Sequence, residues 1–288
     1  MSYLLMCVAI LFCAANSCLL RAYGSKKKDA PAGVFGFNCL VSVGWGTILT
    51  VLFSAGDRAI SPLAALFGTV YGLLLSAFLL FKNLAMGSGN LALTTLIASC
   101  AFLIPTAYSV CFTDESVSAA QLAGIAALLG ALALCVLGKP SKGFTARWAV
   151  NSFLLFLTGG AVGVFYKIFG ASLAAGETNA MLLTASIVSA LLFGIATRAM
   201  NGKDAVRPDR RTVLFAALSA MTSCVYIRLN LALANLIPGA VFFSVSNGAA
   251  ALLGALSGRV FFGERLRKAQ IAGIALGVVS IAVIGFGG

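Results

Sequence analysis

Long apolar runs separated by short polar segments make up most of the chain, and each run has about the length of a membrane-spanning helix. Such a helix needs roughly 20 mostly apolar residues, and the pattern predicts about ten of them. They cover residues 3–20, 31–53, 62–81, 90–112 and 118–137, and then 148–170, 179–199, 212–232, 235–262 and 268–286. The runs are continuous rather than alternating, which favours helices over a β-barrel.

The composition agrees with this interpretation. The 288 residues are 60% hydrophobic and only 10% charged, whereas a soluble domain carries about 25% charged residues. The sequence therefore predicts an all-α integral membrane protein with ten transmembrane helices. There is no histidine, and the eight cysteines form no CxxC pair. We expect these cysteines to be packing residues, and we expect no metal, no cofactor and no enzymatic activity.

The net charge of +12 is located in short loops, so it does not indicate nucleic-acid binding. Loops one, three, five, seven and nine hold nearly all of the cations, while the even loops hold only Arg58. The positive-inside rule then places the odd loops in the cytoplasm and both termini outside a cell membrane, plasma or inner. The cations are Arg21, Lys26, Lys27, Lys28, Lys82, Lys139, Lys142, Arg147, Arg198, Lys203, Arg207, Arg210, Arg211, Arg265, Arg267 and Lys268.

The two halves of the chain match at a shift of 149 residues. Phe112, Glu115, Ala120, Gln121 and residues 123–126 recur as Phe261, Glu264, Ala269, Gln270 and residues 272–275. We expect a first repeat over residues 1–138, a cytoplasmic linker over 139–146 and a second repeat over 147–288. A unit with five spans inserts its second copy upside down, and such inverted repeats are common in secondary transporters. The alternative is that duplication only builds a larger bundle.

The repeated segment also resembles a known family. Glu115 is followed by Gln121-x-x-Gly124, Glu264 is followed by Gln270-x-x-Gly273, and Pro105 lies within the fourth span. In these features the chain is similar to the drug/metabolite transporter superfamily, in particular its EamA-type members. The resemblance implies a five-plus-five inverted repeat, in which spans one to four and six to nine surround a central cavity and spans five and ten are peripheral. Members of the family move amino acids, nucleotide sugars, other metabolites or drugs. They are commonly drawn with both termini in the cytoplasm, opposite to what the charges of this chain predict.

Two cations, Lys167 and Arg228, lie inside predicted spans, where a charge costs a few kcal/mol. They are the first candidates for binding an anionic group of a substrate, because arginine pairs with carboxylate or phosphate through two hydrogen bonds and lysine supplies a point charge. The alternative is snorkelling to the headgroups. For Lys82 and Arg259, nearer the cytoplasmic face, snorkelling or contact with anionic lipid is the preferred interpretation. Polar residues that could line the path are Asn16, Tyr71, Ser99, Tyr166, Tyr226, Ser246 and Asn247.

Small residues at helical spacing predict close helix packing in three stripes: Gly159, Gly160 and Gly163; Ala250, Gly254 and Gly258; and Gly273 with Gly277. Pro105 and Gly254 are positions where we expect the fourth and ninth spans to bend. No acidic residue lies in the middle of a span, which disfavours proton-driven export of cations.

The sequence thus predicts a secondary transporter for a small anionic or zwitterionic metabolite, with that metabolite and the lipid bilayer as partners. A flippase for lipid-linked sugar or another lipid, and a drug exporter of the same fold, are the alternatives. The substrate, the direction of transport, the coupling ion and the oligomeric state, a homodimer included, are not specified by the sequence.

Overall fold

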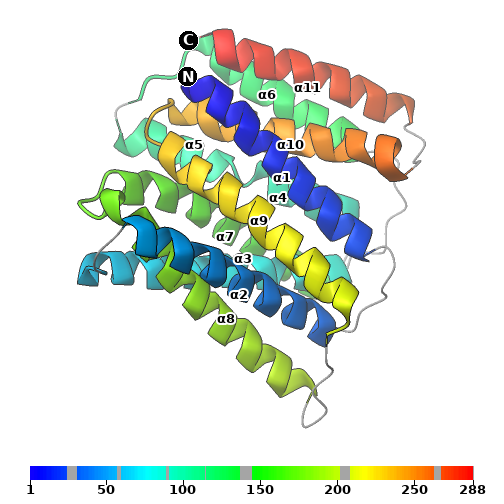
Figure 1. The fold of residues 1–288 in the computed structure, drawn as a ribbon. Helices are drawn as coiled ribbons and strands as arrows, with labels where there is room; N and C mark the ends of the chain where they lie inside the picture. Colours follow the sequence, from blue (N-terminus) through cyan, green and yellow to red (C-terminus); the bar gives the residue numbers. More distant parts are fainter. Residues whose placement is uncertain are drawn as a thin grey trace.

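A computed structural model describes residues 1–24, 31–56, 60–88, 91–113, 115–136, 145–201, 208–262 and 267–287, and within these ranges it contains helices and no strands (Figure 1). The elements are α1 (Ser2–Gly24), α2 (Pro31–Gly56), α3 (Pro62–Ser88), α4 (Leu91–Cys100), α5 (Leu103–Phe112), α6 (Ala119–Val136), α7 (Ala146–Gly170), η1 (Ala175–Glu177), α8 (Thr178–Asn201), α9 (Arg210–Leu233), α10 (Gly239–Phe262) and α11 (Lys268–Phe286).

Nine helical segments in the described ranges are long and apolar enough to cross a membrane. Their positions agree with the predicted spans, and one of the nine is the broken run Thr94–Phe112 formed by α4 and α5. The predicted count of ten is not confirmed, since α6, which covers the fifth predicted span with 18 residues, is a shorter apolar helix outside the nine. At 1.5 Å per residue α6 is about 27 Å long, slightly less than the hydrocarbon core of about 30 Å.

Pro105 interrupts the fourth predicted span. Helix α4 ends at Cys100 and α5 begins at Leu103, so the break falls at the carbonyl four residues before the proline. A proline ring lacks the amide hydrogen and clashes with that carbonyl. The amides of Ala101 and Ile104 instead bond to carbonyls three residues back. The expected bend at Pro105 is therefore present, whereas α10 continues through Gly254 without interruption.

Both termini lie at the same end of the bundle, together with the connections from α5 to α6, from α7 to α8 and from α9 to α10 (Figure 1). We call this the termini end and the opposite end the far end. Of the described loop cations, Arg147, Arg198, Arg211 and Lys268 belong to helix turns at the far end. The other loop cations at positions 26–28, 58, 139, 142, 203, 207 and 265 lie outside the described residues, as does most of the predicted linker.

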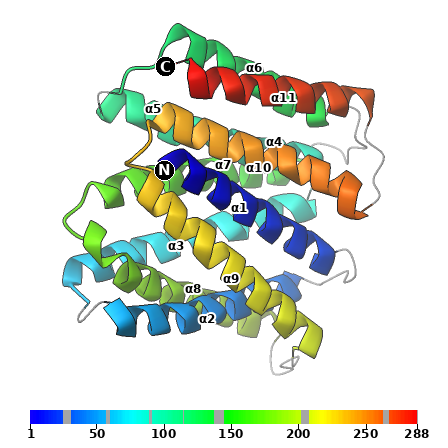
Figure 2. The same cartoon turned by 45° about the horizontal axis from the view of Figure 1, so that its top comes forward.

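Helices from the two halves interleave. The closest pairings are α2 with α8, α3 with α7 and α8, α1 with α9, and α6 with α11. The α6–α11 pair forms one edge of the bundle in both views (Figures 1 and 2). Helices α1, α3, α7, α9 and α10, with the broken α4–α5 run, lie between that pair and the α2–α8 pair.

The repeated Gln-x-x-Gly motif builds the α6–α11 edge. The side-chain oxygen of Gln121 accepts the amide of Ser118, and Gln270 accepts the amide of Arg267, so each glutamine caps its own helix. A Cβ on Gly124 would stand 2.7 Å from Ile284, and one on Gly273 would stand 2.7 Å from the carbonyl of residue 131. The motif therefore has a structural function at the edge of the bundle.

Close packing is confirmed for two of the three predicted small-residue stripes. One is Gly273 with Gly277, where a Cβ at Gly277 would stand 2.7 Å from Leu252. On α7, a Cβ at Gly163 would stand 2.6 Å from the Pro105 ring, and a Cβ at Gly160 would overlap Ile104. The other prediction is wrong at Gly254, because no heavy atom lies within 4 Å of the position that its Cβ would take. Gly254 is half-buried on a continuous helix whose neighbours do not reach it.

Candidate functional site

The termini end of the bundle is closed around the beginning of α10. Residues 240–245 are all buried, with exposed fractions between 0% and 6%. Six consecutive buried residues mean that protein surrounds the helix on every side, since a helix in contact on one face buries only every third or fourth residue. After this segment only one face of α10 is buried: Gly248 and Leu252 are buried, and Asn247 is exposed. The surrounding protein is thus confined to the first two turns.

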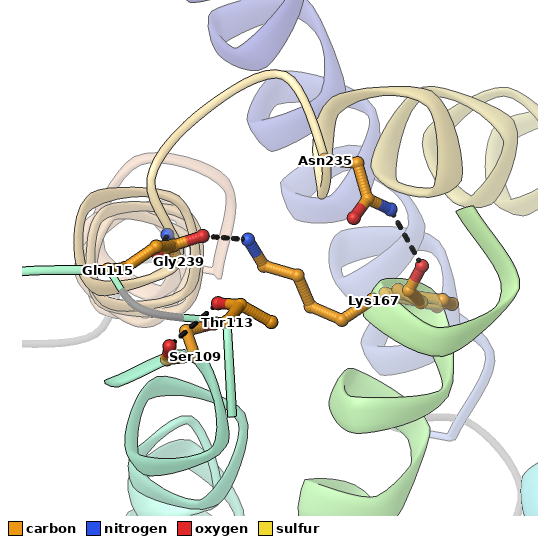
Figure 3. Close-up of polar contacts among 7 residues, drawn as sticks. Ser109, Thr113, Glu115, Lys167, Asn235 and Gly239 are labelled. Carbon is orange, nitrogen blue, oxygen red and sulfur yellow. Dashed lines mark hydrogen bonds and ion pairs between the residues drawn. The ribbon is translucent and has the colours of Figure 1, made fainter. Parts of the chain in front are cut away.

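An ion pair spans this closed end. The loop residue Glu115 receives the ammonium group of Lys167 on one carboxylate oxygen at 2.5 Å and the amide of Gly239 on the other at 2.5 Å (Figure 3). Lys167 is 4% exposed and Glu115 is 22% exposed. The carboxylate lies at the first turn of α10, where the helix dipole favours a negative charge. Glu115 of the first half therefore joins α7 and α10 of the second half.

Glycine is required at position 239 for this arrangement. A Cβ there would overlap the hydroxyl of Ser109 and stand 3.2 Å from the Glu115 carboxylate. The Ser109 hydroxyl is buried and has no hydrogen-bond partner within the described residues, while its carbonyl accepts the hydroxyl of Thr113 (Figure 3). The absence of a side chain lets α10 begin directly against the end of α5.

Two tyrosines, one of them next to Lys167 on α7, are hydrogen-bonded to each other, and a third interacts with them electrostatically. The hydroxyls of Tyr71 on α3 and Tyr166 on α7 are 3.1 Å apart and hydrogen-bonded. Tyr226 on α9 interacts electrostatically with both. Tyr71 is fully buried and stacks on Phe165 with ring centroids 5.0 Å apart. The structure brings together these three predicted site residues, but the Tyr71 hydroxyl is occupied by Tyr166 in this conformation.

Arg228 lies apart from Lys167, in a pocket of about 320 Å³ at the ends of α7, η1, α8 and α9. Its guanidinium donates a hydrogen bond to the side-chain oxygen of Asn179. Thr178 and Asn235 also line this pocket, and the Asn235 amide donates to the carbonyl of Tyr166 (Figure 3). The partner of Arg228 is a neutral amide, so its positive charge is not compensated by a described carboxylate.

The face of α1 that carries Cys13 is exposed at Ser17. Cys13 interacts electrostatically with Lys82 on α3, Tyr166 on α7 and Tyr226 on α9, so it faces the inside of the bundle. Ser17 lies one turn further along the same face of α1 and is exposed. The termini end is thus closed around α10, and the face of α1 that carries Cys13 has an exposed residue one turn nearer the far end.

The remaining predicted site residues have varied surroundings. Asn16 accepts hydrogen bonds from Ser219 and Thr222 and so connects α1 to α9. The Ser246 hydroxyl is buried without a hydrogen-bond partner among the described residues, and Ser99 is half-buried. Asn247 is exposed and donates to the carbonyl of Phe243 in its own helix. None of these four joins the group around Lys167.

Sequence reasoning did not predict the partners Glu115, Gly239 and Asn179. A signal for Glu115 was available, because it recurs as Glu264 at the repeat shift. Asn179 gives no such signal, since polar residues at helix ends are common. Glu264 itself and Asp114 lie outside the described residues.

The fold and the site define a multi-pass helical membrane protein with a partly buried ion pair at one end. No family model matches the chain, and no curated protein matches it. A solved crystal structure described only as that of a protein is similar over 99% of both chains, with a TM-score of 0.76 and 16% identity. At that identity the similarity concerns the fold alone.

Proposed function

We propose that the protein is a secondary transporter that moves a small anionic or zwitterionic metabolite by alternating access. The observation that carries the proposal is the closed termini end, where residues 240–245 are buried on every side and Glu115 pairs with Lys167, while Ser17 nearer the far end is exposed. A transporter that alternates between two openings has to be closed at one end at a time. The Glu115–Lys167 pair would be the contact that separates when the termini end opens.

The helix pairings support an inverted repeat of five plus five spans, with α4 and α5 as the fourth span and α6 as the fifth. Exchanging each helix for its counterpart turns the α1–α9 pair into α7–α3, and the α2–α9 pair into α8–α3. The α2–α8 and α6–α11 pairs map onto themselves. This is the relation expected of two equivalent units around a shared axis, and it is the geometry of the EamA-type resemblance. The repeats over residues 1–138 and 147–288 form part of this proposal.

The charges support an anionic or zwitterionic solute. The described acidic residues are Glu115, Glu177 and Asp209; the first is paired with Lys167, and the other two bond to helix-end amides. Inside the spans the fixed charge is positive. We propose that a carboxylate or phosphate of the solute binds Arg228 and reaches Lys167 when Glu115 releases it, with Tyr166 and Tyr226 beside it. A cation exporter would need an intramembrane carboxylate instead.

One observation favours lipid translocation as the second candidate. A pocket of about 350 Å³ between α3, α5 and α7 is lined only by apolar residues, among them Val70, Ile104 and Leu157. Such a surface would accept an acyl chain. A flippase would use this pocket together with the polar interior, whereas a metabolite carrier would not need it.

The orientation is also proposed from charge. Described cations such as Arg147, Arg198 and Lys268 belong to the far end, which would be cytoplasmic by the positive-inside rule. Both termini would then lie outside a plasma or inner membrane, and the conformation described here would open toward the cytoplasm.

The test is exchange in proteoliposomes loaded with succinate, inorganic phosphate or glutamate, after a thermal-shift screen of a wider panel of solutes. The parent is compared with Arg228→Met and Lys167→Met. The exposed cation Arg259 on α10 provides the control Arg259→Met. We expect flux of at least one anion or zwitterion in the parent and the control, and its loss in Arg228→Met. Flux of a quaternary cation driven by a proton gradient would refute the proposal.

A further inference from the structure

Lys82 does not snorkel to the far end, although its position suggested this. It lies 20 residues after the start of α3, about 30 Å from the termini end and about 9 Å before the end of the helix. Its ammonium group lies over the ring of Phe78, 5.9 Å from the ring centroid. Phe78 is one turn nearer the termini end, so the side chain extends back toward the middle of the bundle.

The ammonium group also faces another helix across the interior. Lys82 on α3 interacts electrostatically with Cys13 on α1. Helices α1 and α3 are not among the pairs that pack closely, since α1 packs on α9 and α10 while α3 packs on α7 and α8. Cys13 and Lys82 therefore face each other from two helices that do not pack closely.

Nothing described neutralises this cation. Lys82 has no ion pair or hydrogen bond within the described residues, and Cys13 and the Phe78 ring are its polar and aromatic neighbours. The acidic residues in the described ranges lie at helix ends and have other partners. An uncompensated ammonium group inside a membrane span is costly, and such residues generally line a water-filled path or bind a ligand.

We propose that Lys82, facing Cys13, is an anion-binding position in the far-end half of the interior, where the acidic group of the solute first binds. This inference deepens the proposed transport function. It rests on that function only in taking the bound anion to be the transported solute. Lys82 and Arg228 lie 20 and 18 residues from the first residues of α3 and α9. In the proposed repeat α3 and α9 are counterparts, so one cation would serve each end of the path.

Cys13 provides a direct probe of this charge. In the full chain with the other seven cysteines replaced by serine, Cys13 is treated with two methanethiosulfonate reagents of similar size. One carries a sulfonate and the other a trimethylammonium group, and each forms a mixed disulfide and releases methanesulfinate. We expect faster modification by the sulfonate reagent at low salt. Lys82→Met should lower the ratio of the two rates by at least about tenfold, because it removes the unit charge that faces the thiolate.

Two variants are the controls for this probe. Lys82→Arg keeps the charge and should keep the ratio, and Arg259→Met removes an exposed cation from the far end of α10 and should leave the ratio unchanged. An unchanged ratio in Lys82→Met, or failure of both reagents to modify Cys13, would overturn the inference. If Lys82→Met does not fold, the parent protein is measured alone at low and high salt. Faster modification by the sulfonate reagent at low salt, lost at high salt, supports the inference. Equal modification rates at low salt refute it.

Protection experiments identify the source of the anion. Succinate or inorganic phosphate should slow the modification of Cys13 in the parent but not in Lys82→Met. Protection only by micelles containing phosphatidylglycerol would instead assign the position to a lipid headgroup and overturn the solute site. The probe requires no flux, so absence of exchange in proteoliposomes would refute the transport proposal and leave the anion-binding position in place.

Discussion

Glu115 holds the ammonium group of Lys167 and the amide of Gly239 at the same distance, 2.5 Å, one on each carboxylate oxygen. The two partners are 72 residues apart in the chain (239 minus 167), and they belong to different helices of the second half. One side chain from a loop of the first half thus contacts both α7 and α10 at the termini end. The stability of the closed conformation should depend on the charge of this pair.

Replacing Glu115 by glutamine should destabilise the protein more than replacing both partners. The single change leaves the ammonium group of Lys167 buried without a counter-ion, which costs about 3 kcal/mol. Glu115→Gln combined with Lys167→Met removes both charges and should recover most of that loss. The measurement is the free energy of unfolding in detergent micelles titrated with sodium dodecyl sulfate. Equal losses in the single and double variants would show that the ion pair contributes nothing.

A methyl group added at Gly163 should also destabilise the protein. The Cβ would lie 2.6 Å from the Pro105 ring, which is held in place by the break between α4 and α5. Helices α5 and α7 cannot separate without losing packing contacts. Gly163→Ala should therefore lower the free energy of unfolding by about 1–3 kcal/mol. Gly254→Ala is the matched control within another span, because no atom lies within 4 Å of its Cβ position. The same denaturation measurement should find the control unchanged or slightly stabilised.

The elements of the fold were predictable from hydropathy because lipid requires every span to be a helix. The break before Pro105 was predictable from proline chemistry as well. The partners of the ionic residues were not, because Glu115 and Lys167 are 52 residues apart and their meeting depends on how the two halves interleave. The strongest repeat signal, Gln121 with Gly124, belongs to the α6–α11 edge. It therefore indicated the fold and carried no information about the solute.

Lys82 illustrates a second limit. Its position near the far end of α3 favoured snorkelling, and only the location of its ammonium group over Phe78 shows that the side chain extends the other way. Sequence position fixes the depth of a Cα atom in the bilayer. For a side chain as long as lysine it does not fix the depth of the charge.

The hydrogen bond between Tyr71 and Tyr166 predicts a coupled effect on stability. Both hydroxyls are buried and 3.1 Å apart, so Tyr71→Phe leaves the Tyr166 hydroxyl without its partner and should cost about 1–3 kcal/mol. Tyr71→Phe combined with Tyr166→Phe should cost less than the sum of the two single changes. A double-mutant cycle in the detergent denaturation assay measures this coupling. Strict additivity would mean that the two hydroxyls do not depend on each other.

The contact between Arg228 and Asn179 offers a change of charge with almost no change of shape. The guanidinium donates to the side-chain oxygen of Asn179, and Asn179→Asp would place a carboxylate oxygen in the same position. The internal carboxylate would then compete with the acidic group of the solute for Arg228. We expect the apparent affinity for the transported anion to fall at least about tenfold, equivalent to about 1.4 kcal/mol, while the free energy of unfolding stays the same or rises.

Asn179→Ser is the control, because it keeps a neutral hydrogen-bonding oxygen near Arg228 and should retain most of the affinity. The measurement is the concentration dependence of exchange in proteoliposomes, together with the thermal shift produced by the same anion. Loss of affinity in both variants would point to the shape of the pocket rather than to its charge. Unchanged affinity in Asn179→Asp would exclude Arg228 as a contact of the solute, because a compensated guanidinium could not attract an anion as strongly as a free one.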